Sequence, residues 1–183
     1  MALLISERMT DGYDQAHLER VLADVYAFFK AETGLNVALP DVEISTAVKD
    51  SAWYDDNGVI SINPEHNPEE LDAGELVAHE FFHHVQNELF WKKMAWKPEE
   101  EEIKKINELM EGTAFLFAAV FIYHEKKNAD DLIKEYMSNK KHMTKSGVGN
   151  ALALRAYRES NFSMNLFVKN ITDYALMSEL FGG

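Results

Sequence analysis

The sequence contains no cysteine among its 183 residues. A disulfide framework and a metal site built on thiolates are therefore both excluded, and any metal ion has to be held by histidine and carboxylate side chains. Basic residues are also scarce, since 18 Lys and Arg stand against 31 Asp and Glu, for a net charge of −13. This balance argues against a nucleic acid or an anionic membrane surface as the partner.

Long apolar runs are missing as well. Nowhere do about 18 apolar residues follow one another, the length that a membrane-spanning helix requires. The opening stretch, MALLISERMTDGYD, has an apolar run too short for a secretory signal, and no basic residue precedes that run. We therefore expect a cytoplasmic protein with no membrane partner.

What is present indicates one folded domain over residues 1–183, with 46% hydrophobic residues and three Trp. Helical spacing of apolar residues, followed by Gly34, predicts a helix over residues 14–32. β-branched residues predict strands around 42–48 and 59–63, and the turn signal Asp55-Asp56-Asn57-Gly58 precedes the second. We expect two or three antiparallel strands in the part before residue 95.

The remaining half is predicted to be mainly helical. The pattern Asn67-Pro68-Glu69-Glu70 is a good helix start, and that helix should run to about residue 93. Further helices are expected over residues 98–125, 130–137 and 150–180, with a break at Gly147 and Gly149. A small antiparallel or mixed sheet and a helix within residues 1–95, followed by helices over 96–183, make an α+β fold.

Residues 79–83 read His-Glu-Phe-Phe-His within the stretch ELVAHEFFHHVQNELF. His79 and His83 stand four apart on the predicted helix, so both imidazoles project to the same side. Glu80 lies near that side, close enough to reach a metal-bound water. The opposite face is apolar, with Val77, Phe81, Phe82, Val85 and Leu89. An apolar back and a His/His/Glu front predict a catalytic zinc site rather than a chance pair of polar residues. His84 points about 100° away from His83 and is interpreted as a flanking residue or as one that supports the metal ligands.

A catalytic zinc ion takes three protein ligands, so one more is needed. If the two helices form an antiparallel hairpin that turns near Lys97, His83 lies 14 residues before the turn and Glu111 lies 14 residues after it. At about 1.5 Å per residue, the two side chains stand at the same height on adjacent helices, whereas Glu108 is about 4.5 Å away along the axis. We therefore predict Glu111 as the third ligand of one zinc ion per chain.

The segments HEFFHHVQNE and ELMEGTAFLFA together resemble the gluzincin branch of the zincin metallopeptidases, over roughly residues 53–120. The resemblance implies a zincin-like fold in which His79, His83 and Glu111 hold zinc and Glu80 is the general base that activates the zinc-bound water for peptide-bond hydrolysis. It also implies a peptide or protein substrate, which the strand GVISIN would bind as the edge strand of the sheet. The compact size is similar to the minigluzincins, and the 28-residue spacing from His83 to Glu111 is similar to regulatory peptidases of the ImmA/IrrE type.

Gluzincins often stabilise the oxyanion with a Tyr or His from the C-terminal part. His142, Tyr123 and Tyr157 are the candidates here, and we expect Tyr157, which Arg155 and Arg158 flank. The apolar tail YALMSELF is interpreted as the last core helix, although it could also block a cleft in a latent form.

Two alternatives remain open. The chain could be a non-catalytic or regulatory zincin scaffold that only binds a partner, although the expected base, Glu80, is present. It could also be a di-iron helical protein, because Glu80-x-x-His83 is itself a Glu-x-x-His motif. That architecture needs a second such motif, and none of the other six histidines has a Glu three residues before it.

Overall fold

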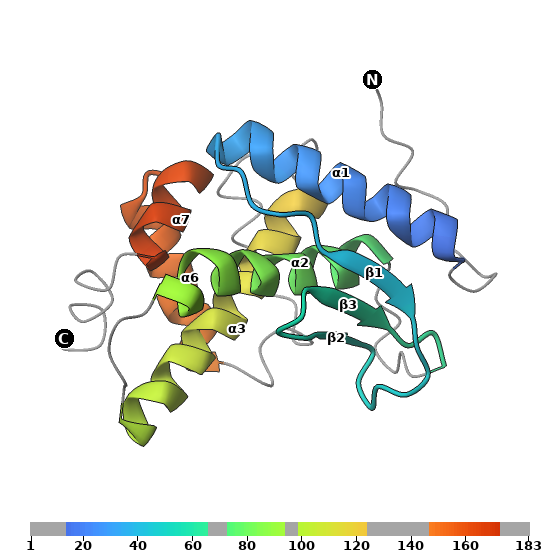
Figure 1. Cartoon of the computed structure of the whole chain (residues 1–183). Coiled ribbons are helices and arrows are strands. Elements are labelled where there is room, and N and C mark those ends of the chain that lie inside the picture. Colours follow the sequence, from blue (N-terminus) through green and yellow to red (C-terminus); the bar gives the residue numbers. More distant parts are fainter. Residues whose placement is uncertain (1–13, 66–72, 94–98, 124–146, 173–183) are drawn as a thin grey trace.

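The structure is a computed structural model that describes residues 14–65, 73–93, 99–123 and 147–172 (Figure 1). The described residues form an α+β fold with a small three-stranded sheet and a mainly helical remainder. Helix α2 (Ala73–Leu89) lies in the middle and contacts α1 (Gln15–Thr33), α3 (Glu100–Tyr123), β2 (Ala52–Tyr54) and β3 (Val59–Ile62). The expected α+β class is confirmed at this level.

The first helix begins and ends within one residue of the predicted bounds, 14–32. Asp14 caps α1, because its side chain accepts a hydrogen bond from the backbone N–H of His17. Gly34 ends it in the left-handed conformation, with φ of 69°, and its N–H donates to the carbonyl of Lys30. Leu18, Leu22, Val25 and Phe29 form its buried stripe.

The sheet is mixed, and its strand order differs from the expectation. Strand β1 (Asp41–Ile44) pairs in parallel with β3, and β2 pairs antiparallel with β3 on the other side, so the order is β1-β3-β2. The strand GVISIN is therefore central, and the prediction that it is the edge strand is wrong. The edges are β1 and β2, and β2 is a strand that the sequence interpretation missed.

Helix α2 carries the predicted two-faced pattern. Val77, Phe81, Phe82 and Val85 are buried in the main core, with Leu89 packed against it. The predicted cap at residues 67–70 lies outside the described residues. At its other end α2 stops at Leu89 rather than near Lys93, and Trp91–Lys93 form a short 3₁₀ turn.

Helix α3 packs against α2 with the chains running in opposite directions. Phe90, after the end of α2, clusters with Ile106 and Met110, whereas Phe82, farther back, stacks on Phe117. The hairpin turn itself falls at residues 94–98, outside the described residues. By length and composition α3 could cross a membrane, but 67% of its apolar window is buried inside the structure, as in the core helix of a soluble protein.

The predicted helix over 150–180 is divided in two. Helix α6 (Gly147–Glu159) and α7 (Met164–Thr172) are separated by Asn161 and Phe162, whose φ angles are 51° and 59°. Two consecutive left-handed residues cannot continue a right-handed helix. Gly149 lies inside α6 rather than in a break before it. The predicted helix over 130–137 and the apolar tail over 174–181 lie outside the described residues.

Candidate metal centre

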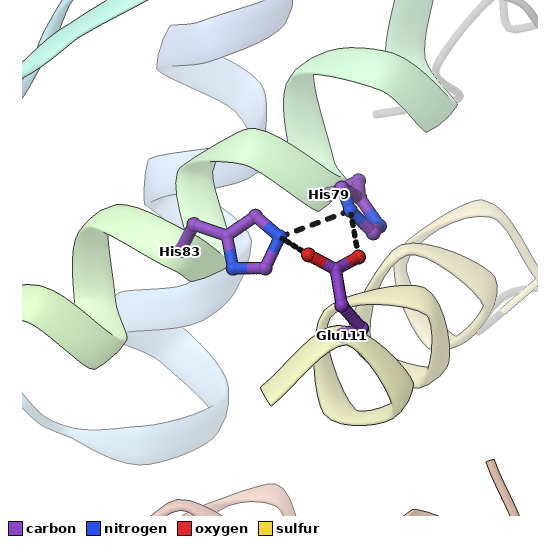
Figure 2. Close-up of side chains that lie close together, drawn as sticks. All are labelled: His79, His83 and Glu111. Carbon is purple, nitrogen blue, oxygen red and sulfur yellow. Dashed lines mark hydrogen bonds and ion pairs between the residues drawn. The ribbon is translucent and has the colours of Figure 1, made fainter. Parts of the chain in front are cut away.

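Helices α2 and α3 together bring the three predicted ligands to one point. His79 and His83 are one turn apart on α2, and Glu111 projects toward both from α3 (Figure 2). The side chains of His79 and His83 are 12% and 18% exposed, and that of Glu111 is 46% exposed. The centre is thus set into the protein and is reached from solvent on the Glu111 side.

The three side chains converge through specific atoms. The Nε2 atoms of His79 and His83 lie 3.1 Å apart, and the Glu111 carboxylate oxygens lie 3.5 Å from the first and 3.4 Å from the second (Figure 2). Ligand atoms in a tetrahedral zinc site are separated by about 3.3–3.5 Å, which follows from zinc–ligand bonds of about 2.0–2.2 Å. The two nitrogen–oxygen edges of the triangle match this spacing and the nitrogen–nitrogen edge is slightly shorter, so the three atoms stand close to three corners of such a site.

The same three groups form an ionic cluster. Burial lowers the pKa of His83, but its hydrogen bond to Glu111 and the charges of Glu80 and Glu111 outweigh burial and raise the pKa to about 9. For Glu111, partial burial raises the pKa, whereas hydrogen bonds to His79 and His83 hold it well below its ordinary range. A proton on His83 thus occupies the place where a cation would bind, and a metal ion would displace that proton.

The two histidines are held differently. The Nδ1 atom of His83 lies 2.8 Å from the amide oxygen of Gln86. The Nδ1 atom of His79 is buried and has no hydrogen-bond partner among the described residues. Its ring is instead positioned by Phe115 of α3, at a centroid distance of 4.2 Å.

Glu80, the predicted base, is 8% exposed and its charge acts on His83. A buried carboxylate beside a histidine cluster is suited to accept and return a proton. A groove of about 720 Å³ runs along α3 from its first turn to Glu111, past Asn107 and Glu108. The groove is open to solvent and is lined by α3 alone, and of the three converging side chains only Glu111 borders it.

His84 faces away from the three converging side chains and belongs to a separate polar network. Its Nε2 donates to the carbonyl of Ala38 at 2.6 Å, so its Nδ1 accepts from the Tyr54 hydroxyl at 3.1 Å. Asn87 in turn donates to the same hydroxyl at 3.0 Å. Burial lowers the pKa of His84, in agreement with the neutral form that this network requires. The network fastens α2 to β2 and to the segment before β1.

The contacts of Tyr157 with the described residues do not bring it to the converging side chains. Its ring packs edge-on against Phe162 and Phe167 at 5.6 and 5.5 Å and is 6% exposed. Burial raises the pKa of Tyr157, and the charge of Glu32 adds to that effect. These contacts are those of a packing tyrosine. Of the other oxyanion candidates, Tyr123 is the last residue of α3 and His142 lies outside the described residues.

No protein-family model, no curated protein and no solved structure matches this chain significantly. The converging side chains themselves are therefore the basis for assigning a function.

Proposed function

We propose that the chain is a zinc-dependent metallopeptidase of the gluzincin type with a zincin-like fold, in which His79, His83 and Glu111 hold one zinc ion. The observation that carries the proposal is the convergence of two histidine nitrogens and one carboxylate at 3.1–3.5 Å, next to the buried carboxylate of Glu80. Two imidazoles and a carboxylate are a donor set of catalytic zinc sites.

The elements around the cluster support the zincin-like interpretation. Strand β3 leads through residues 63–72 to the helix that carries both histidines, and a separate helix, α3, carries the glutamate. Antiparallel β2 forms one edge of the sheet and contacts α2. We therefore propose β2, the edge strand that contacts α2, as the substrate-binding strand in place of β3.

The chemistry of the proposal is hydrolysis of a peptide bond. When bound, zinc lowers the pKa of a coordinated water toward about 7 and polarises a carbonyl group. Glu80 accepts the proton of the attacking water and delivers it to the leaving amine. Burial of Glu80 and of the His79 and His83 rings keeps bulk water away from this proton transfer.

The edge strand β2 can position an extended substrate. In an antiparallel pair alternate residues turn their main-chain groups toward the neighbour. The Asp55 N–H donates a hydrogen bond across to Val59, and the Ser51 carbonyl accepts one from Asn63. Trp53 lies between them, opposite Ser61 of β3. Ala52 and Tyr54 therefore turn their N–H and C=O groups away from β3, toward the side of β2 on which no other described strand lies. We propose that the substrate is an extended peptide segment of a cytoplasmic protein, which pairs its main chain with β2.

The deciding measurement is the metal content of the purified chain by elemental mass spectrometry, with a Glu111→Ala variant beside it. About one zinc per chain that falls sharply in the variant supports the three-ligand site. No zinc in the wild type, even after zinc addition, refutes it. Two irons per chain would favour the di-iron alternative.

Activity separates the enzyme from a binding scaffold. The wild-type chain is incubated with a library of peptides and cleavage is followed by mass spectrometry, with Glu80→Gln as the matched control. Cleavage by the wild type that disappears in a Glu80→Gln protein still loaded with zinc supports the peptidase. A zinc-loaded wild type that binds peptides and cleaves none favours the non-catalytic scaffold.

A further inference from the structure

We propose that Gln86 is a positioning residue of the metal centre. It holds His83 in the tautomer whose Nε2 lone pair faces His79 and Glu111. This inference rests on the proposed zinc site and adds a residue that the His-Glu-x-x-His motif does not include. It follows from the hydrogen bonds of one buried amide.

The orientation of the Gln86 amide is determined by α3. Gln86 is 2% exposed, and its side-chain nitrogen lies 2.8 Å from the Met110 carbonyl oxygen and 2.8 Å from the Thr113 hydroxyl oxygen. A carbonyl can only accept, so the amide group that faces Met110 has to be the NH₂. The Thr113 hydroxyl donates its own hydrogen to Met110 at 2.9 Å and is therefore an acceptor for Gln86. Both amide hydrogens are used, and the amide oxygen points the other way.

The amide oxygen selects the tautomer of His83. It lies 2.8 Å from Nδ1 of His83, and because it can only accept, Nδ1 has to carry a hydrogen. In a neutral imidazole the other nitrogen, Nε2, then carries the lone pair. Nε2 is the atom that lies 3.1 Å from His79 and 3.4 Å from Glu111. A metal ion requires a lone pair at that nitrogen, so the backbone of α3 acts through Gln86 to prepare His83 for coordination.

The same amide also joins the two helices that supply the ligands. Its acceptors, Met110 and Thr113, flank Glu111 on α3, and its own backbone belongs to α2, one turn after His83. His79 has no comparable hydrogen-bond support among the described residues. We therefore expect the geometry of the centre to depend on Gln86 more than on other buried amides of α2.

Asn87 provides a matched control on the same helix. It is also a buried amide, 8% exposed, but its side chain donates to the Tyr54 hydroxyl on the sheet side of α2. Replacing Asn87 with leucine removes a buried hydrogen bond of similar kind without changing the partner of His83. Replacing Gln86 with methionine keeps the size of the side chain and removes the acceptor for Nδ1.

The experiment measures the Zn²⁺ affinity of the full chain by competition with a chromophoric chelator, and the thermal stability of each variant. We expect Gln86→Met to weaken Zn²⁺ binding by about 10–100-fold, and Asn87→Leu to lower stability while leaving the affinity unchanged. Gln86→Glu retains an acceptor for Nδ1, but it loses both donors and sets a carboxylate against the Met110 carbonyl. Gln86→Glu should therefore be less stable than Gln86→Met and yet bind Zn²⁺ more tightly than Gln86→Met does.

If Gln86 had only a structural role, Zn²⁺ affinity would follow stability, and Gln86→Met would bind Zn²⁺ more tightly than Gln86→Glu. That order would overturn the proposal. Equal affinity of the wild type and Gln86→Met would also overturn it, whereas a wild type that binds no Zn²⁺ would refute the metal site itself. If a Gln86 variant does not fold, Thr113→Val takes its place, because it removes one anchor of the amide without touching His83. Weaker Zn²⁺ binding then supports the proposal, and unchanged binding refutes it.

Discussion

Replacing Gly149 with alanine tests how closely α6 has to approach the helix that carries Glu111. A Cβ atom at this position would lie 1.8 Å from the carbonyl oxygen of Glu108 and 2.6 Å from its carbonyl carbon. A carbon and an oxygen in contact are about 3.3 Å apart, so α6 and α3 would have to separate by roughly 1.5 Å. Both obstructing atoms belong to the backbone, and no change of rotamer can relieve the contact.

The expected loss of stability follows from two opposing effects. Overpacking of an interior contact costs about 1–3 kcal/mol, occasionally more. Alanine favours a helix over glycine by at most about 1 kcal/mol, and less in the first turn, where Gly149 lies. A gap of this width also forfeits much of the dispersion energy along the interface. We expect a net loss of about 2 kcal/mol, which lowers Tm by roughly 4–8 °C in a chain of this size.

The assay is thermal unfolding followed by far-ultraviolet circular dichroism, together with Zn²⁺ affinity. Gly34→Ala is the control, because a Cβ there meets nothing within 4 Å although φ is 69°. Its backbone strain of about 1–2 kcal/mol lowers stability without moving α3. Since Glu108 is nearly one turn before Glu111, Gly149→Ala should weaken Zn²⁺ binding as well, whereas Gly34→Ala should not. A Tm for Gly149→Ala equal to or above that of the wild type would refute the reasoning.

Four further outcomes are expected. Glu80→Gln should keep its zinc and lose peptide hydrolysis by about 10²–10⁴-fold, which metal analysis and a cleavage assay on the same sample check together. Zinc at 100 times its Kd should raise the free energy of unfolding by about 2.7 kcal/mol in urea titrations, and Glu111→Ala should abolish most of this gain. In the metal-free protein the raised pKa of His83, about 9 against 6.5 unfolded, contributes stability that is complete below pH 6.5 and is lost as the pH rises to about 9. The lowered pKa of Glu111 contributes stability that is present above pH 4.5 and is lost on acidification. Because of His83, urea titrations of metal-free protein should show the free energy of unfolding falling between pH 6.5 and 9. The same titrations of Glu111→Gln should give a flatter profile. Tyr157→Phe should leave kcat unchanged, because the Tyr157 ring packs against Phe162 and Phe167; a large decrease in kcat would restore Tyr157 as an oxyanion residue.

The parts of the fold that the sequence predicted are those with local causes. Helix α1 has its cap at Asp14 and its stop at Gly34, both readable from neighbouring residues. The meeting of His79, His83 and Glu111 was predicted from a four-residue helical spacing and from a symmetric hairpin of two helices that follow each other along the chain. Whether the three side chains hold zinc stays a prediction.

The parts that the sequence did not predict depend on contacts between distant segments. Strand β1 pairs with β3 rather than with β2, and the residues of any one strand do not indicate which of the other two it will pair with. The turn Asp55–Gly58 could have indicated β2, because a hairpin turn before one strand requires another strand before the turn. The break at Asn161 and Phe162 had only a weak signal, the Ser and Asn residues around it. Gln86 could not be recognised at all, since its role depends on the Met110 carbonyl of another helix.

The stretch His83-His84-Val85-Gln86-Asn87 contains the same histidine–amide spacing twice, rotated by about 100° around α2. In the first pair, Gln86 orients His83 and is itself anchored on α3 beside Glu111. In the second, His84 and Asn87 both bond to Tyr54, on the edge strand. Because the two pairs share one helical turn, the turn that orients His83 also sets the position of β2. The distance between the proposed metal centre and the proposed substrate strand is therefore determined by a single rigid segment, so a peptide paired with β2 would meet the centre in a defined register.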